Sequence, residues 1–580
     1  MERLEKREWL ALAVLFLLVG GLFSYLPFSG QSVFLSPDET GVFVAAKNVK
    51  EQGTIALAES YASTIPWLHP RSWISHGSTI VPVGFLGWPW IMSWFIRFGD
   101  QFASIGAMLV ILSAIYPFYR LLRPMGKIPA FIGTIVAFTA PALILYGNRS
   151  LFPNAGFVAL AIWTAWMFRD IVIPAKAGIQ LSEGKNIFDR LLFKLDPSVR
   201  WDDKLCLFLF GLLSGLTLAI RPVEMFWLLP WFIFLGWNWR PTLKQVRWIL
   251  LGLLIALIPI IWQAQTAYGG FWKAGYWMKG NIVSTAGIRQ NTAVSPEVFP
   301  FGIHPKNIAY NAWTFLLGPL FPWMVPLLML FVLFVASIAR DLRVIPAPPL
   351  ASLAFGGKAG IQNRLNIWIS TLAGTGSPPS RGRQITLIAF WSFASLILYY
   401  GNGKYLDNIN GLATIGNSYV RYLLPLGFLA GLAIAWLYRV TSPTKYGRHI
   451  IITMTIILAF TGIWRAYAAD GEGLIAGKQE LNRYAQIRSD AGQWFKSGDI
   501  IISERSDKIF FPEYRAVSPL PDMNQALQLS NATEQGIHIG LFARPLGQSQ
   551  ADAWRKVGLD PVELAAFGRE KLYRLQPINP

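Results

Sequence analysis

Long apolar stretches recur along the chain, and several reach the roughly 17–25 residues that an α-helix needs to cross the hydrocarbon core of a membrane. The first covers residues 9–27 and follows a short charged head, MERLEKRE. Further candidate spans lie at 103–119, 128–146, 155–168, 205–220, 223–237, 248–265, 312–337, 385–400, 422–438 and 449–464. We therefore predict an α-helical polytopic membrane protein with about eleven transmembrane helices.

The overall composition supports this class and excludes others. Only 14% of the 580 residues are charged and 53% are apolar, whereas a soluble protein carries roughly 25% charged residues. An ordinary water-soluble enzyme is therefore excluded, and so is a disordered chain, because disordered segments are poor in apolar residues. The single cysteine, Cys206, excludes a disulfide framework and any cysteine-based zinc or iron–sulfur site.

Lysine and arginine predict the orientation, because they accumulate in cytoplasmic loops. With the N-terminus inside, the loops assigned to the cytoplasm hold 25 Lys and Arg, and the opposite loops hold 12 although they contain more residues. No small-residue cleavage site follows the first span, so we interpret it as a retained anchor. We predict a membrane protein with its N-terminus inside and its C-terminus outside. Because membrane insertion accounts for the cytoplasmic cations, we do not expect nucleic-acid binding.

Two apolar segments need a separate interpretation. Spans 205–220 and 223–237 are separated by little more than an Arg-Pro pair, which predicts a tight helical hairpin. Residues 80–98 are almost long enough to cross, and counting them as a span would reverse every later loop. They contain Pro82, Gly84, Gly87 and Pro89, which weaken a continuous helix. We therefore interpret 80–98 as a juxtamembrane or re-entrant segment.

Two domains are predicted. Residues 1–464 form the membrane domain with a large first outer loop at 28–102, and residues 465–580 have no spanning segment. Short apolar runs at 499–503, 536–541 and 571–575 alternate with helical patterns such as 551–567, which is typical of a small α/β domain. The topology places that domain on the extracytoplasmic side of the membrane.

The cytoplasmic loops 173–185 and 344–384 have the character of insertions. AKAGIQ at 175–180 recurs as GKAGIQ at 357–362, and the second loop is rich in Pro, Gly and Ser. We favour low-complexity insertion into tolerant loops over a regulatory role.

The first outer loop opens with SPDET, which includes the carboxylates Asp38 and Glu39. One interpretation is helix-start chemistry, because proline and acidic residues are favoured in a first helical turn. The other is a carboxylate pair that binds a polar substrate beside the bilayer. Because adjacent residues on a helix face different ways, one carboxylate should then perform chemistry while the other supports it.

With these features the sequence resembles the GT-C superfamily of membrane glycosyltransferases, including the protein O-mannosyltransferases and the lipid A aminoarabinose transferases. The Asp-Glu pair of SPDET matches the family's loose acidic signature, and HGSTIVPVGFLGWPW (76–90) resembles its interfacial segment. GNSYVRYLLPL (416–426) is similar to the Arg-Tyr-Leu-Leu-Pro element of a late helix, and GLLSGLTLAIRP (211–222) to a Gly-rich helix that ends in a basic residue. The second outer loop, YGNRSLFPN (146–154), lacks the carboxylate that relatives often carry there.

The resemblance implies an enzyme that moves a sugar from a polyprenyl-phosphate carrier to an acceptor hydroxyl on a glycan, lipid or protein at the outer membrane face. Asp38 would act as the general base and Glu39 as its partner. Direct attack at the anomeric carbon would invert its configuration. The departing lipid phosphate needs cations.

Outer-face cations are scarce and are therefore candidates for the donor phosphate. Arg421 is our first choice, beside Tyr422, although an interfacial anchor would have the same sequence position. Lys404 and Arg149 are further candidates, and a solvated loop charge is the alternative for Lys404. Arg221 and Glu224 lie at membrane depth, where ionisable groups are expensive; they form either a substrate site or a mutually neutralising pair.

His76 and Arg71, in HPRSWISHG, are candidate contacts to phosphate or sugar, with ordinary interfacial loop residues as the alternative. We expect no cofactor. A divalent metal at Asp38 and Glu39 with His76 is the alternative, but no tight ligand spacing supports it. The sequence has no Walker A motif, no G-x-S-x-G elbow and no dinucleotide-binding fingerprint.

Two other functions remain as rivals. A lipid or oligosaccharide flippase is disfavoured, because the two halves show no inverted repeat of hydropathy. An O-antigen-type polymerase or ligase also uses polyprenyl-linked sugar, and it would shift the emphasis from Asp38 to Arg149, Arg421 and His304.

Overall fold

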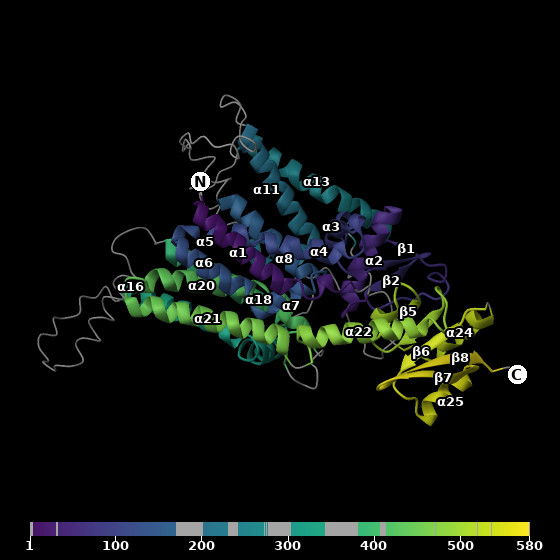
Figure 1. Cartoon of the computed structure of the whole chain (residues 1–580). Coiled ribbons are helices and arrows are strands. Elements are labelled where there is room, and N and C mark those ends of the chain that lie inside the picture. Colours follow the sequence, from purple (N-terminus) through teal and green to yellow (C-terminus); the bar gives the residue numbers. More distant parts are fainter. Residues whose placement is uncertain are drawn as a thin grey trace, which may run out of the picture.

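A bundle of apolar helices fills one part of the molecule, and a small domain built on a sheet lies at one end of it (Figure 1). This computed structural model describes residues 4–30, 33–169, 201–224, 226–229, 242–271, 273, 275, 303–342, 381–405, 413–469, 471–518, 520–534 and 536–578. The two loops predicted as insertions, 173–185 and 344–384, lie outside the described residues except for 381–384, which belong to a helix.

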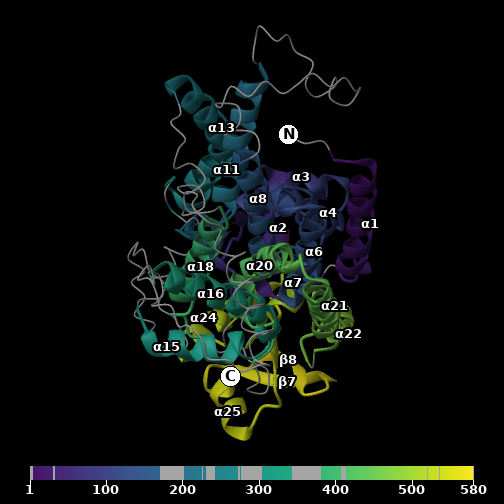
Figure 2. The same ribbon diagram turned by 90° about the vertical axis from the view of Figure 1, so that its left-hand side faces the viewer.

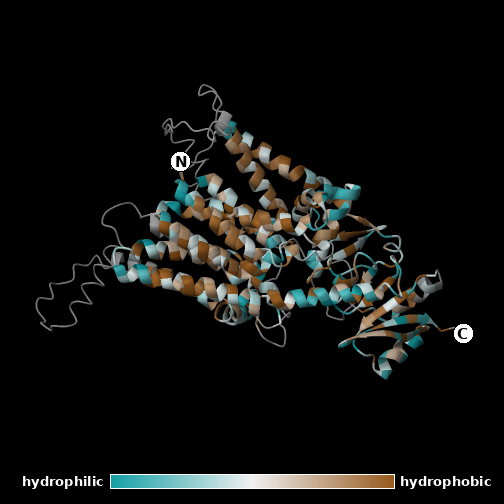
Figure 3. Cartoon of the chain, viewed as in Figure 1, coloured by the Kyte–Doolittle hydropathy of each residue, from teal (hydrophilic) through white to brown (hydrophobic). Residues whose placement is uncertain are grey.

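The bundle consists of apolar helices. They are α1 (Lys6–Phe23), α4 (Phe102–Ser113), α5 (Ile115–Leu122), α6 (Lys127–Phe138), α7 (Pro141–Asn148), α8 (Pro153–Met167), α11 (Trp201–Ile220), α13 (Leu243–Tyr268), α16 (Phe321–Leu342), α18 (Arg381–Tyr400), α20 (Pro425–Thr441) and α21 (Lys445–Ala468). The short helices α15 (Pro305–Asn311) and α19 (Ser418–Tyr422) lie in loops between them. Colouring by hydropathy shows that the bundle is largely apolar along its length (Figure 3).

The chain is a multi-pass membrane protein by the length and composition of its helices. Within the described residues, three helical segments can each cross a membrane: Phe102–Met125, Leu243–Tyr268 and Lys445–Ala468. Three pairs of helices bent by 60°, 109° and 108° pass the same test together, which gives up to six spans. A proline stands at or beside each bend, at Pro141, Pro222 and Pro322, because proline cannot continue the hydrogen bonding of a helix interior. Eleven spans and the orientation stay predictions.

Glycines let some bundle helices approach each other closely. A Cβ added to Gly431 of α20 would lie 2.3 Å from the carbonyl oxygen of Gly133 on α6, and one added to Gly133 would lie 2.5 Å from the carbonyl oxygen of Gly431. Small residues at such crossings allow the backbone contact that drives helix association in membranes. Helices α11 and α13 also pack side by side (Figures 1 and 2), with Gly252 against the carbonyl oxygen of Phe208. Beyond α11 the described part of the predicted hairpin turns by 109°, and residues 230–237 lie outside the described residues.

The first outer loop folds into helices and a small sheet. After α2 (Pro37–Gln52), the strands β1 (Leu57–Ala58), β2 (Trp73–His76) and β3 (Thr79–Pro82) form an antiparallel sheet in the order β1-β3-β2. Segment 80–98 then forms the end of β3, the helix α3 (Gly87–Phe95) and a single 3-10 turn, Ile96–Phe98. Since α3 has only nine residues, it cannot cross a membrane as a helix, as predicted.

The C-terminal part is a small α/β domain, as predicted. Its mixed sheet has the strand order β5-β4-β6-β8-β7, with β4 parallel to β5 and β6 and the other pairs antiparallel. The elements are α22 (Leu474–Ala491), β4 (Ile500–Ser503), α23 (Asp507–Phe510), β5 (Arg515–Val517), α24 (Met523–Glu534), β6 (Ile539–Ala543), α25 (Gln548–Lys556), β7 (Leu559–Phe567) and β8 (Glu570–Pro577). Helix α21 runs on to Ala468, past the predicted boundary at 464.

One prediction in this domain is wrong in part. The helical pattern at 551–567 becomes a helix only as far as Lys556, and Leu559–Phe567 is the edge strand β7. Gly558 adopts a φ of +83°, a left-handed conformation that ends helices. The strand then gains backbone hydrogen bonds from β8, and such tertiary pairing overrides local helix preference.

The first outer loop and the C-terminal domain pack against each other. Ile65 and Leu68 of the loop belong to the same buried apolar cluster as Ile500 and Leu541 of the sheet. Two ion pairs flank this contact. Arg71 bonds Asp507 at 2.7 Å, and Arg515 bonds Glu59 at 3.0 Å. The loop that carries the SPDET motif is therefore attached to a domain more than 400 residues away in sequence.

We expect Gly431→Ala to lower the thermal unfolding temperature of the detergent-solubilised protein, because the new Cβ would press on the backbone of α6. Overpacking of this kind costs about 1–3 kcal/mol of unfolding free energy. Gly21→Ala is the matched control, since a Cβ there meets nothing within 4 Å. Equal unfolding temperatures for the two variants, measured by tryptophan fluorescence, would contradict the close crossing.

Candidate functional site

The SPDET motif starts the helix α2. Ser36 is the N-cap, and its hydroxyl accepts a hydrogen bond of 3.2 Å from the backbone N–H of Asp38. Pro37 occupies the first helical position, and Asp38 and Glu39 complete the first turn, where the helix dipole favours negative charge. The helix-start interpretation is therefore correct as a description of local structure. The same geometry sends the two adjacent carboxylates in different directions.

Glu39 points into the protein and pairs with Arg149. Its carboxylate lies 2.9 Å from the Arg149 guanidinium, which also donates through Nε at 3.2 Å. The Glu39 side chain is only 5% exposed. Arg149 follows the last residue of α7, where the chain turns before Pro153 starts α8. This buried pair joins the first outer loop to the α7–α8 corner of the bundle.

Asp38 makes a different pair. Its Oδ2 lies 2.7 Å from Nη1 of Arg421, which belongs to the short helix α19. The Asp38 side chain is 43% exposed, so its carboxylate can be reached from solvent. The pairing brings together the first outer loop and the GNSYVRYLLPL segment. These are two of the sequence motifs that each resemble the GT-C family.

Arg221 and Glu224 form a third pair in the same region. Arg221 donates to Glu224 at 2.7 Å, and Glu224 also accepts a hydrogen bond of 2.8 Å from the indole of Trp227. Both charged side chains are buried. The two residues are three positions apart in sequence, and a short 3-10 turn that begins at Pro222 brings their side chains together. The mutually neutralising pair is therefore present, and it lies beside the other candidate residues.

Aromatic rings connect the three arginines into one cluster. The ring of Phe152 has the guanidiniums of Arg149 and Arg421 at 4.9 and 5.1 Å from its centroid. The ring of Tyr422 has those of Arg421 and Arg221 at 5.3 and 5.2 Å. Cations over aromatic faces are stabilised by the ring quadrupole. We call these residues with their carboxylates the arginine cluster: Asp38, Glu39, Arg149, Phe152, Arg221, Glu224, Arg421 and Tyr422.

Tyrosines extend the cluster on one side. The ring of Tyr400, at the end of α18, stacks on Tyr422 with centroids 4.2 Å apart, and Tyr405 lies 6.1 Å from Tyr422. Lys404 is exposed and directly precedes Tyr405. Tyr400 is buried, whereas Tyr405 and Tyr422 are half-buried, so flat rings and phenol groups lie beside the arginines and are partly accessible.

A small cavity of about 90 Å³ adjoins the buried side of the cluster. Glu39 lies in its wall together with polar side chains from the loop and from α4, and with apolar residues that follow α1. Its polar lining residues are Ser29, Asp100, Gln101, Ser104, Asn148 and Ser150.

Three predicted candidates make their described contacts elsewhere. Arg71 donates its guanidinium to Asp507 and to the carbonyl oxygen of Arg505 in the C-terminal domain. His76 is the last residue of β2, and its ring lies beside Gly269, the residue that follows α13. A Cβ built on Gly269 would be 3.8 Å from Nε2 of His76. His304, named for the polymerase alternative, precedes α15 and binds Asn402 through its backbone N–H.

The donor set around Asp38 and Glu39 does not fit a divalent cation. Each carboxylate already carries an arginine, whereas a metal site needs several oxygen or nitrogen ligands that converge on one point. Across the described part of the chain, no three His, Cys, Asp or Glu side chains are grouped closely enough to hold a metal ion.

Sequence reasoning missed Phe152 and Tyr400. Phe152 stands in the loop quoted for its missing carboxylate, and the signal available was an aromatic residue three positions after Arg149. Tyr400 belongs to a pair of tyrosines at the end of an apolar span, a position that interfacial anchoring also explains.

We expect Arg149→Met to destabilise the protein strongly, because it leaves the buried Glu39 carboxylate unpaired. Breaking a buried pair in this way costs about 3–5 kcal/mol. The double variant Glu39→Gln/Arg149→Met should recover much of the unfolding temperature. Asp38→Asn is the comparison at an exposed carboxylate and should change it little. A double variant as unstable as Arg149→Met would argue against the pair.

Comparisons with known proteins reveal similarity in three dimensions. No protein-family model matches the chain, and no curated protein sequence matches it. ArnT from Cupriavidus metallidurans, solved both in the apo state and bound to undecaprenyl phosphate, matches 97% of this chain over 97% of its own. Both comparisons have a TM-score of 0.50 and 11% sequence identity.

A third structure, the Archaeoglobus fulgidus oligosaccharyltransferase in the apo form, covers 93% of this chain and 69% of its own, with 11% identity and a TM-score of 0.44. The similarity to ArnT extends over the helical bundle and the C-terminal domain together. At 11% identity it establishes the fold alone. The resemblance inferred from the motifs is thereby confirmed at the level of architecture: the chain has the fold of ArnT.

Proposed function

We propose that this protein is a glycosyltransferase that moves a sugar from a polyprenyl-phosphate carrier to an acceptor hydroxyl on the outer face of a bacterial inner membrane. The observation that carries the proposal is the Asp38–Arg421 ion pair, which joins an accessible carboxylate to a guanidinium at 2.7 Å. A base for the acceptor and a cation for the leaving phosphate thus belong to one site, and a single displacement needs both, one on each face of the anomeric carbon.

The position of the arginine cluster supports a lipid carrier. Its arginines come from the ends of helices or from the turns between them, beside aromatic rings. A carrier whose hydrocarbon chain lies in the bilayer presents its phosphate at this level. The structure of ArnT with undecaprenyl phosphate has the same fold, and we extend that ligand class to this chain.

The reaction would proceed in one step. The acceptor hydroxyl gives its proton to the Asp38 carboxylate while its oxygen forms a bond to the anomeric carbon of the sugar. The bond from that carbon to the phosphate oxygen breaks, and the electron pair leaves with the polyprenyl phosphate. Because attack and departure occur on opposite faces, the anomeric configuration inverts. No covalent enzyme intermediate is required.

Arg421 would exchange partners when the donor binds. In the structure it neutralises Asp38. A phosphate is a stronger partner for a guanidinium than one carboxylate oxygen, because it offers bidentate hydrogen bonds and more charge. Donor binding would therefore draw Arg421 toward the phosphate and free Asp38 to accept the hydroxyl proton. Catalysis would then depend on the donor being in place.

The remaining residues divide into support and binding. Glu39 and Arg149 would hold the start of α2 against the bundle. Because Arg149 and Arg421 lie near the same Phe152 ring, the charge of Arg149 would add to the attraction for the donor phosphate. Arg221 would face the phosphate across Tyr422, and Glu224 would keep Arg221 in place. Lys404, which is exposed and follows α18, is the further cation we assign to the donor. The acceptor is a glycan, a lipid or a protein.

The rival functions differ in measurable ways. A flippase would move the carrier across the membrane of a vesicle without transferring sugar. A polymerase or ligase of the O-antigen type would depend on His304, which lies apart from the arginine cluster in its described contacts. If a His304→Ala variant is otherwise unchanged and still transfers sugar, the result would therefore favour the present proposal.

We expect Asp38→Asn to abolish transfer, because the amide cannot accept the hydroxyl proton. The loss should be at least 100-fold, within the roughly 10²–10⁴-fold that general base catalysis contributes. The assay follows ¹⁴C-labelled hexoses and pentoses supplied on undecaprenyl phosphate and incorporated into host membrane acceptors. Asp552→Asn, an exposed carboxylate paired with Arg555 on α25, is the control. Unchanged turnover in Asp38→Asn would reject the assigned base.

Arg421→Met should weaken binding of undecaprenyl phosphate at least tenfold, because it removes a charge-assisted contact to the phosphate, for which about 1.5–3 kcal/mol is typical. Binding can be measured by native mass spectrometry in detergent. Arg97→Met, an arginine that lies over Trp94 in the first outer loop, should leave it unchanged. Equal affinity for the two variants would remove Arg421 from the donor site.

A further inference from the structure

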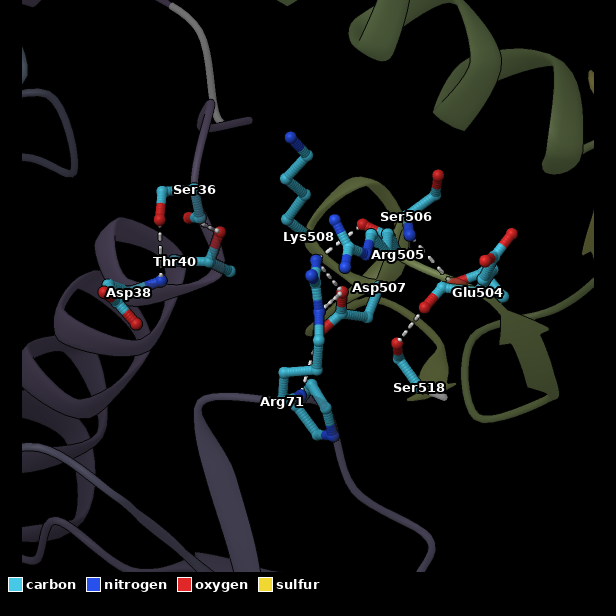
Figure 4. Close-up of polar contacts among 12 residues, drawn as sticks. Ser36, Asp38, Thr40, Arg71, Glu504, Arg505, Ser506, Asp507, Lys508 and Ser518 are labelled. Carbon is cyan, nitrogen blue, oxygen red and sulfur yellow. Dashed lines mark hydrogen bonds and ion pairs between the residues drawn. The ribbon is translucent and has the colours of Figure 1, made fainter. Parts of the chain in front are cut away.

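A lysine of the C-terminal domain reaches the SPDET motif. Lys508 is the second residue of the short helix α23, and its ammonium donates a hydrogen bond of 2.7 Å to the carbonyl oxygen of Leu35. Leu35 directly precedes Ser36, the N-cap of α2. Figure 4 shows Lys508 and Arg71 between the helix that carries Asp38 and the C-terminal domain.

The base of Lys508 is fixed by its neighbour. Asp507 is fully buried, and it accepts hydrogen bonds from the backbone N–H of Arg71 at 2.8 Å and from Arg71 Nε at 2.9 Å. These contacts hold α23 against the first outer loop (Figure 4). The Lys508 ammonium also lies 4.8 Å from the ring centroid of Tyr484, on α22. Lys508 is therefore held at both ends.

The surroundings of Lys508 disfavour its charge. Burial, together with the positive charges of Arg71 and Arg149, lowers the pKa of Lys508 to about 8, and the negative charges of Asp507 and Glu480 oppose this shift. Arg149 belongs to the arginine cluster, so Lys508 approaches that cluster from the side of the C-terminal domain. The Lys508 side chain is half-buried, and its ammonium is engaged by the Leu35 carbonyl oxygen and the Tyr484 ring.

We propose that Lys508 is a positioning residue, through which the C-terminal domain fixes the first turn of α2 and with it the Asp38 carboxylate. The proposal rests on the proposed function, since it gives Asp38 the role of base. Lys508 itself touches no substrate. It acts by holding the carbonyl oxygen immediately before the N-cap, in the segment whose direction decides where Asp38 points.

Loss of the Lys508 contact would lower the turnover number rather than the affinity for the donor. Catalysis is sensitive to displacements of about 1 Å in a reacting group. Loss of the Lys508 contact would leave α2 attached to the bundle, because Glu39 in its first turn still pairs with Arg149, but the segment that leads into the Ser36 cap would lose its anchor to the C-terminal domain. Asp38 would lose its fixed direction while the donor-binding arginines stay in place. The turnover number should therefore fall while the donor KM stays the same.

Two variants and a control test this. Lys508→Met keeps the length of the side chain without a donor, and Lys508→Arg restores a donor to the Leu35 carbonyl. Lys571→Met makes the same change on β8, where the ammonium pairs with Glu563 on the neighbouring strand. Hydrogen–deuterium exchange reports the backbone amides at 36–42, and the transfer assay reports kcat and KM for the donor.

We expect Lys508→Met to increase exchange at 36–42 at least tenfold and to lower kcat about tenfold, which corresponds to about 1.4 kcal/mol of transition-state stabilisation. The donor KM should change less than twofold. Exchange in β4 and β6 should stay unchanged, which shows that the domain remains folded. Lys508→Arg should restore at least half of kcat, and Lys571→Met should match the wild type.

A pH profile provides a readout that a structural role would not move. Below pH 8 the Lys508 ammonium is charged and bonded. Above pH 8 it loses its proton, and its hydrogen bond to Leu35 weakens. We expect the wild-type kcat to fall above about pH 8 and the Lys508→Arg kcat to lack this limb. The charged and titratable neighbours Arg71, Arg149, Asp507, Glu480 and Tyr484 are the same in both proteins.

The outcomes separate this inference from the function on which it rests. Unchanged exchange at 36–42 in Lys508→Met would overturn the inference, whatever the activity. Loss of transfer in Asp38→Asn together with normal kcat in Lys508→Met would also overturn it, while the proposed function would stand. Normal transfer in Asp38→Asn would remove the proposed function, and increased exchange in Lys508→Met would then still show that Lys508 orders the motif.

Discussion

The pairing of charges at one end of an apolar bundle is the interaction on which the rest of this structure depends. Glu39 and Arg149 are both largely buried, and neither could be placed there alone, because an isolated charge in a low-dielectric environment costs several kcal/mol. Their contact holds α2 against the corner between α7 and α8. The first outer loop, the bundle and the cavity beside Glu39 take their relative positions from this contact.

The same helix turn sorts two adjacent carboxylates into different tasks. Asp38 and Glu39 are neighbours in sequence, but their directions on α2 differ and so do their environments. Glu39 faces the bundle and is 5% exposed, whereas Asp38 faces outward and is 43% exposed. A buried, paired carboxylate suits structural support, and an accessible one suits proton transfer. Their arginine partners come from segments about 270 residues apart.

The C-terminal domain is part of the same arrangement rather than an appendage. Its buried Asp507 binds the first outer loop, and its Lys508 reaches the residue before the SPDET helix cap. The mixed sheet behind α23 shares an apolar cluster with Ile65 and Leu68 of that loop. A movement of this domain would therefore be transmitted to Asp38 through a few identified contacts.

The sequence alone determined the membrane class, the separate C-terminal α/β domain and the short, broken character of residues 80–98, because these follow from local hydropathy and from proline and glycine. It also identified most residues of the arginine cluster, since charges are scarce in the loops that the sequence predicts to lie outside. Only the tertiary structure decided that Asp38 meets Arg421, that Glu39 meets Arg149, and that Arg71 serves the C-terminal domain. It likewise turned 559–567 into a strand and brought Lys508 to Leu35. These contacts join segments far apart in the chain, and local patterns carry no information about which distant surfaces will meet.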